Sequence, residues 1–170
     1  ELERDSPVGV AAFVALVRGW VRVGDLARAT TIQEMLQQQG EWEAAAIALA
    51  EIALAEAKRG ELPSALEKMQ QASKLGVARP GVLRRFTVLA IESGDKFIAE
   101  ASLQMLVDAG VTPAGPICTA LLMQCENSGE FDSILTAIEA WPCHRNRNVA
   151  LQVVRACVRL GDLERAQYEL

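Results

Sequence analysis

The sequence predicts an all-α protein in which helix–turn–helix repeats stack in chain order as a solenoid. Five glycines are each followed by an acid, at steps of 36, 34, 35 and 32 residues: Gly24, Gly60, Gly94, Gly129 and Gly161. A fixed period of this size is typical of stacked helical hairpins. Aromatic residues make up only 5% of the chain, and no long stretch alternates apolar with polar residues, so nothing indicates strands.

Each glycine–acid pair predicts the bend between the two helices of one repeat. Glycine adopts positive φ without steric cost, and it commonly ends a helix in that conformation. The acid then stands at the start of the second helix, where the helix dipole favours negative charge. We therefore expect a hairpin bend at all five glycines.

The second helix of each repeat carries an apolar stripe. Positions 2, 5, 9 and 12 after the glycine share one helical face, because they are spaced three, four and three apart. Seventeen of the nineteen residues there are apolar, and the exceptions are Gln33 and Lys96: Leu26, Ala29, Gln33, Leu36; Leu62, Ala65, Met69, Ala72; Lys96, Ala99, Leu103, Leu106; Phe131, Ile134, Ile138, Trp141; Leu163, Ala166, Leu170. We expect this face to be buried.

The repeats occupy approximately residues 8–43, 44–78, 79–113, 114–146 and 147–170, about four and a half units of one solenoid segment spanning 1–170. In the first three, a closing glycine follows the turn glycine by 16 residues, at Gly40, Gly76 and Gly110. The fourth lacks it and has an irregular loop around His144 instead. Because the chain begins at Glu1 and stops inside the fifth repeat, we expect it to belong to a longer array.

The four cysteines predict buried thiols in a reducing compartment rather than disulfides or a metal site. Cys118, Cys125, Cys143 and Cys157 show no CxxC spacing. Cys118 and Cys125, seven apart, would lie about 10 Å apart along a helix, too far to share one ion comfortably. His144, the single histidine, is expected to be a solvated loop residue, with a base or ligand role as the alternative.

These repeats resemble the pentatricopeptide repeat family in degenerate form. The resemblance rests on the period of about 35 residues, the acid and leucine after the turn glycine, the alanine three residues later, and the Gly110-Val111-Thr112-Pro113 junction. The second repeat, with Gly60, Ala65 and Ala72, is equally similar to a tetratricopeptide repeat. Either resemblance implies a right-handed superhelix of helical hairpins.

The pentatricopeptide resemblance implies binding of single-stranded RNA in a mitochondrion or chloroplast. That family reads one base per repeat through the residue ten before the turn glycine and a partner four after the closing glycine. The first positions hold Val14, Ala50, Arg84, Thr119 and Leu151 here, and the second hold Ala44, Pro80 and Ala114. Only Thr119 fits, so contact with the RNA backbone is expected to outweigh base readout.

Charge supports a basic inner surface on an acidic protein. The chain has a net charge of −5, but the fourteen residues before each turn glycine hold nine cations and four acids. In repeat arrays these first helices line the concave face, where such a stripe would attract phosphates. The residues predicted to bind RNA or an acidic partner are Arg18, Arg22, Lys58, Arg84, Arg85, Thr119, Arg155 and Arg159.

Two functions remain open at this point, and neither is enzymatic. The chain has no phosphate-cradling glycine loop, no nucleophile beside an evident base and no metal-ligand cluster, so no cofactor is expected. The first function is RNA binding in RNA processing, stability or translation. The alternative is a protein scaffold subunit of a large assembly, an organellar ribosome or a membrane complex. The longest uninterrupted apolar run, 10–17, is too short to span a membrane.

Overall fold

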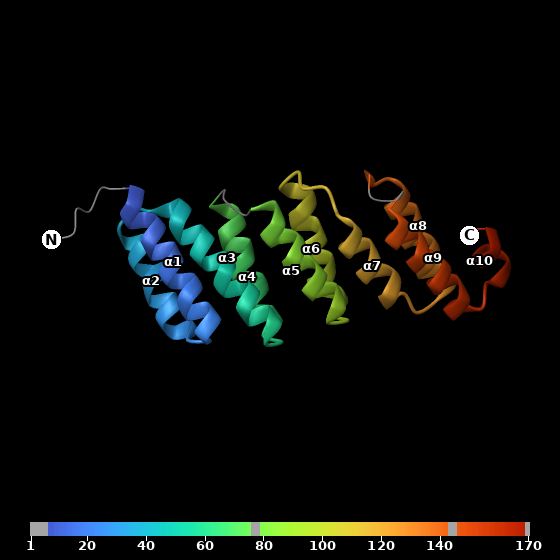
Figure 1. Ribbon diagram of the computed structural model, residues 1–170, viewed down its shortest axis with the longest axis horizontal. Coiled ribbons are helices and arrows are strands. Elements are labelled where there is room, and N and C mark those ends of the chain that lie inside the picture. The colour runs from blue at the N-terminus through green and yellow to red at the C-terminus, as the bar shows by residue number, and fades with distance from the viewer. Residues whose placement is uncertain (1–6, 76–78, 143–145, 169–170) are drawn as a thin grey trace. The chain divides into compact units, whose positions relative to one another are not determined.

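The computed structural model describes residues 7–75, 79–142 and 146–168 (Figure 1). This part of the chain holds ten helices and no strand, which confirms the all-α prediction. The helices are α1 Pro7–Val23, α2 Leu26–Gln38, α3 Trp42–Lys58, α4 Leu62–Lys74, α5 Pro80–Glu92, α6 Lys96–Asp108, α7 Gly115–Gln124, α8 Ser128–Glu139, α9 Arg147–Leu160 and α10 Leu163–Tyr168. The superhelical solenoid and its handedness stay predictions. None of the described helices is long and apolar enough to cross a membrane.

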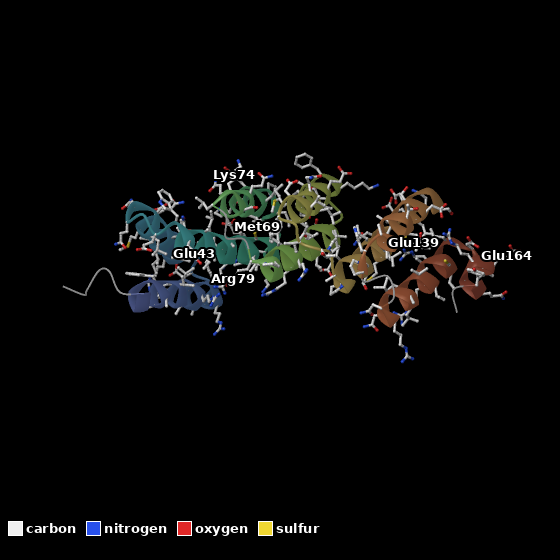
Figure 2. The ribbon with its side chains drawn as sticks, turned by 90° about the horizontal axis from the view of Figure 1, so that it is seen from above. Glu43, Met69, Lys74, Arg79, Glu139 and Glu164 are labelled. Atoms are coloured by element: carbon white, nitrogen blue, oxygen red, sulfur yellow. The ribbon has the colours of Figure 1, made fainter. Side chains whose placement is uncertain are left out.

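The chain divides into two compact units, residues 1–86 and 87–170, and the division falls within α5. Inside each unit, helices pack against their neighbours in the chain and against the helix two places on, as α1 does with α2 and α3. In the first unit, Figure 2 shows α1 and α3 on one side and α2 and α4 on the other. α7 and α9 lie likewise against α8 in the second.

The first unit is organised around the alanine-rich helix α3, which contacts α1, α2 and α4. Its small side chains are buried on several sides, and alanine has the highest helix propensity of any residue. Met69 of α4 is fully buried, on the side of that helix that faces α3 (Figure 2). The core between α1, α2 and α3 comprises Val17, Ala29, Leu36, Ala44, Ala45, Ala48 and Ile52.

The second unit has a core shared by α7, α8, α9 and α10. Its buried residues are Cys118, Leu122, Cys125, Phe131, Leu135, Ile138, Val149, Val153, Ala156, Cys157 and Ala166. Cys118, Cys125 and Cys157 are buried, as predicted, and no disulfide joins them to another described residue, while Cys143 and His144 lie outside the described residues. α5 and α6 also touch in this unit, where the buried Thr87 hydroxyl donates to the carbonyl of Ser102 at 3.4 Å.

Four of the five predicted hairpin bends are confirmed. Gly24, Gly60, Gly94 and Gly161 have φ between 77° and 90° and separate the two helices of a repeat. The acid that follows stands at the start of the second helix, and three of the four acids cap it. Asp25, Asp95 and Asp162 accept hydrogen bonds at 3.0–3.1 Å from the amide three residues on, whereas Glu61 makes no such bond.

The prediction of a bend at Gly129 is wrong, because this glycine lies in the first turn of α8. The bend lies earlier, at residues 125–127. Asn127 caps α8 through Oδ1, which accepts from the amide of Glu130 at 2.9 Å, and the Glu130 carboxylate accepts from the amide of Glu126 at 2.9 Å. An asparagine followed three residues later by a glutamate is a strong helix start, and it overrides the glycine.

The apolar stripe is buried in most repeats but only in part in α6. In α2 and α4 all of its positions are buried or half-buried, and in α8 Phe131 and Ile138 are buried. In α6 the buried residues are Ile98, Ser102, Met105 and Leu106, while Ala99 and Leu103 are only half-buried. Leu163 is exposed, and Leu170 lies outside the described residues.

In the second unit, ion pairs at the surface join α6 to α8 and α8 to α10: Lys96 to Glu130 at 2.8 Å, and Arg165 to Asp132. The hydrogen bond between Lys96 and Glu130 raises the pKa of Lys96 and lowers that of Glu130. Because the pKa of the Glu130 carboxyl is lowered, the ion pair stabilises the folded state fully at pH values above the ordinary pKa of 4.5. This stabilisation is lost as the pH falls through the lowered pKa. Because the pKa of the Lys96 amine is raised, the stabilisation is lost on the alkaline side only at pH values above 10.5.

Replacing Lys96 by Met should therefore raise the pKa of Glu130 part of the way toward 4.5, since the bond from the Glu126 amide remains. A carboxyl-carbon NMR titration measures this. Lys74→Met, at another exposed lysine, is the control and should leave Glu130 unchanged. An unaltered Glu130 titration in Lys96→Met would mean that the ion pair does not form in solution.

Candidate functional site

The side chains predicted to bind a partner lie on first helices, as expected, but they do not all line one binding site. Arg18 and Arg22 lie on α1 and Lys58 in the last turn of α3. Arg84 and Arg85 lie on α5, and the others on α7 and α9 of the second unit. Two of them, Thr119 of α7 and Arg155 of α9, line the same groove.

This groove has a volume of about 490 Å³ and is formed within the second unit by α5, α7 and α9. We call it the α5–α7–α9 groove. Its lining residues are Val88, Glu92, Gly115, Pro116, Thr119, Ala120, Met123, Asn146, Asn148, Leu151, Gln152 and Arg155. A site of this size is in the range of ligand-binding clefts.

The starts of α7 and α9 contribute Gly115, Pro116, Asn146 and Asn148 to the lining. α7 begins with Gly115 and Pro116 after an extended residue, a position where proline loses no hydrogen bond. α9 begins after Asn146, whose Oδ1 accepts from the amide of Asn148 at 2.8 Å. The two helix starts lie close together, because a Cβ on Gly115 would be 3.6 Å from Asn146 Nδ2.

The groove offers hydrogen-bonding groups of both kinds. Asn146, Asn148 and Gln152 bear amides that donate and accept, and Thr119 adds a hydroxyl. The side chains of Thr119, Gln152 and Arg155 hold no hydrogen bond or ion pair with another residue that the structure describes. Charge is balanced in the lining, since Arg155 is opposed by Glu92.

Two exposed apolar side chains, Met123 and Leu151, complete the lining. Their exposed fractions are 60% and 46%, which is high for such residues. Together with the amides, they form a surface that has both apolar side chains and hydrogen-bonding groups. This combination suits a ligand with flat or aliphatic parts joined to polar edges.

Three of the predicted cations, Arg18, Arg84 and Arg159, make contacts within the protein. Arg18 Nε donates to Glu51 Oε1 of α3 at 2.9 Å, which neutralises both groups. Arg159 Nη2 donates to the carbonyls of Leu122 and Cys125 at 2.7 and 3.0 Å, and it lies 3.1 Å from the Cys125 sulfur. A guanidinium there satisfies carbonyls at the C-terminus of α7 and complements the helix dipole.

The same kind of contact links repeats in the first unit, where Arg59 Nη2 donates to the carbonyl of Gly24 at 2.6 Å. Arg59 follows α3 and Gly24 follows α1, so each arginine stabilises the end of the preceding first helix. Among the predicted cations, Arg22, Lys58 and Arg85 are exposed, and Arg84 is half-buried and holds a contact within the protein.

Sequence reasoning missed most of the groove. It singled out Thr119 and Arg155, but not the amides of Asn146, Asn148 and Gln152 or the exposed Met123. The available signal was spacing, because positions 148, 152 and 155 are four and three apart and so share one face of α9 with Leu151. No cluster of potential metal ligands occurs among the described side chains.

Comparison with models of known protein families and with curated proteins gives no match for this chain.

Proposed function

We propose that the chain is a helical-repeat protein that binds single-stranded RNA in the α5–α7–α9 groove. The observation that carries the proposal is the convergence of Thr119 and Arg155 with three amide side chains in one groove. Base edges in single-stranded RNA are recognised by such hydroxyl and amide groups, and phosphates by arginine.

Each part of the groove has a task in this proposal. Asn148 and Gln152 donate to and accept from base edges, Met123 and Leu151 pack against base faces, and Arg155 pairs with a phosphate. Because Arg18 and Arg159 are already engaged, few cations remain for phosphates. We therefore expect modest affinity with a shallow salt dependence, on the order of −0.7 in log K per log salt for each phosphate contacted.

The pentatricopeptide resemblance extends the proposal to cellular role. It suggests action in RNA processing, stability or translation inside a mitochondrion or chloroplast, with no catalytic step by this chain. The repeats of a longer parent protein would add further binding positions along the same strand.

A second function, a scaffold that holds a polypeptide, is favoured by Glu92 and by the exposed Met123 and Leu151. A carboxylate repels phosphates, and exposed apolar side chains take up those of an extended peptide. The amides would then bond the peptide backbone. Treatment of the captured parent protein with nuclease separates the two functions, because only RNA-bound partners are released.

The RNA proposal predicts that Arg155→Glu lowers affinity for a fluorescein-labelled single-stranded RNA of mixed sequence by about tenfold or more. Fluorescence anisotropy in 150 mM salt measures this. The control is Lys74→Glu on α4 of the first unit, which makes the same change in net charge at an exposed site. If both variants lost affinity equally, RNA binding would depend on net charge alone and the groove would be refuted. The double variant Arg84→Glu with Arg85→Glu tests the α5 cations in the same assay.

A further inference from the structure

A second cavity of about 450 Å³ lies in the second unit, and it shares no residue with the α5–α7–α9 groove. It opens between α6 and α8, so we call it the α6–α8 pocket. Apolar atoms from α5, α6, α7 and α8 line it, contributed by Ile91, Ala99, Leu103, Leu121, Cys125 and Ile134.

The α6–α8 pocket exists because this junction between repeats is incompletely packed. Ala99 and Leu103 belong to the apolar stripe of α6, yet they are only half-buried, as is Ile134 of α8. α8 begins at Ser128, three residues before the position that the other repeats predict from their turn glycine. Apolar side chains that meet the next helix in other repeats face an opening here.

Acids dominate the charged residues around the α6–α8 pocket. Asp95, Glu100, Glu126 and Glu130 line it, against the single cation Lys96, which is paired with Glu130 at 2.8 Å. Glu126 and Glu100 also lie near enough to Lys96 to raise its pKa. The lining therefore carries a net charge of about −3 around an apolar floor.

We propose that the α6–α8 pocket docks a basic polypeptide segment, which places one bulky apolar side chain on the floor and its lysines or arginines against the acids. The acids come from the bend before α6 (Asp95), from α6 (Glu100), from the bend before α8 (Glu126) and from the first turn of α8 (Glu130). A ligand that matches them needs several positive charges spread around one apolar anchor. Polypeptide supplies this chemistry, and the proposal does not depend on RNA binding in the groove.

The test uses four synthetic 12-residue peptides, each with several Lys and Arg residues around one central Leu, Ile, Phe or Trp. Methyl NMR of the full chain in 150 mM salt should show shifts at Leu103 and Ile134 with at least one peptide, at a Kd of roughly 100 μM or tighter. The same peptide with Ser at its centre, or with Glu in place of Lys and Arg, should not bind. If none of the four peptides shifts these methyl groups, the proposal is wrong.

Two variants separate docking from bulk attraction. Glu100→Lys with Glu126→Lys reverses two exposed acids of the pocket, and affinity should fall by about tenfold or more. Glu34→Lys with Glu67→Lys makes the same charge change on α2 and α4 of the first unit, and affinity should stay within about twofold. Equal losses would overturn the proposal, whereas RNA affinity measured on the same variants reports on the groove alone.

Discussion

Leu106→Asp and, separately, Ile138→Asp should each lower the free energy of unfolding by about 3–5 kcal/mol. Both side chains are buried, with exposed fractions of 0% and 1%, on the second helices of the third and fourth repeats. A carboxylate in such an apolar layer must either stay charged without a partner or bind a proton, and both outcomes cost stability. Because total stability is about 5–15 kcal/mol, the loss should melt the surrounding helices.

The matched controls are exposed residues directly adjacent to Leu106 and Ile138 in the chain. Val107→Asp places the same carboxylate one position from Leu106 at a side chain that is 66% exposed, and Ala137→Asp does so beside Ile138. We expect both controls to stay within about 0.5 kcal/mol of the wild type in urea unfolding followed by circular dichroism. If Leu106→Asp unfolded at the same urea concentration as Val107→Asp, the burial of this face would be refuted.

Lys68→Met should lower the free energy of unfolding by about 2–3 kcal/mol, because it leaves the buried carboxylate of Glu56 without its cationic partner. Glu56 of α3 is 8% exposed, and Lys68 of α4 donates to it at 3.0 Å and lies 2.9 Å from its other oxygen. Ser64 adds a bond to the same carboxylate at 3.0 Å. The magnitude lies below that of a fully buried pair, since the lysine side chain is a quarter exposed.

A double substitution tests this explanation. Glu56→Leu with Lys68→Met replaces both partners by apolar side chains, and stability should return to within about 1 kcal/mol of the wild type. Lys74→Met on the same helix removes an exposed lysine and should change little. Thermal and urea unfolding of these four proteins compare the double variant with Lys68→Met, and a double variant as unstable as Lys68→Met would contradict the explanation.

The all-α fold and most of the hairpin bends could be predicted because both depend on local chemistry that repeats. Glycine at positive φ and an acid at the next helix start recur every repeat, as at Gly24 and Asp25. Gly129 was misleading because a competing local signal, the Asn127 cap with Glu130, starts α8 earlier. The regular spacing of the glycines does not reveal whether the glycine or a nearby capping residue determines where the second helix begins.

The candidate site was less predictable because it depends on which helices meet. Thr119 and Arg155 were identified one by one, but only the structure places them in one groove with Gln152. Arg159 has the same residue type and helix as Arg155, yet its guanidinium binds the carbonyls that end α7. A count of cations on first helices cannot distinguish these two roles, since the difference lies in contacts with a neighbouring repeat.

Crosslinking of single-stranded RNA that carries 4-thiouridine, followed by mass spectrometry of the linked peptides, tests the central claim most directly. The RNA proposal predicts crosslinks in the segments of α7 and α9 that hold Thr119, Met123, Leu151 and Arg155, and their loss in Arg155→Glu. Crosslinks confined to α6 and α8, or no crosslink to the intact chain, would contradict it.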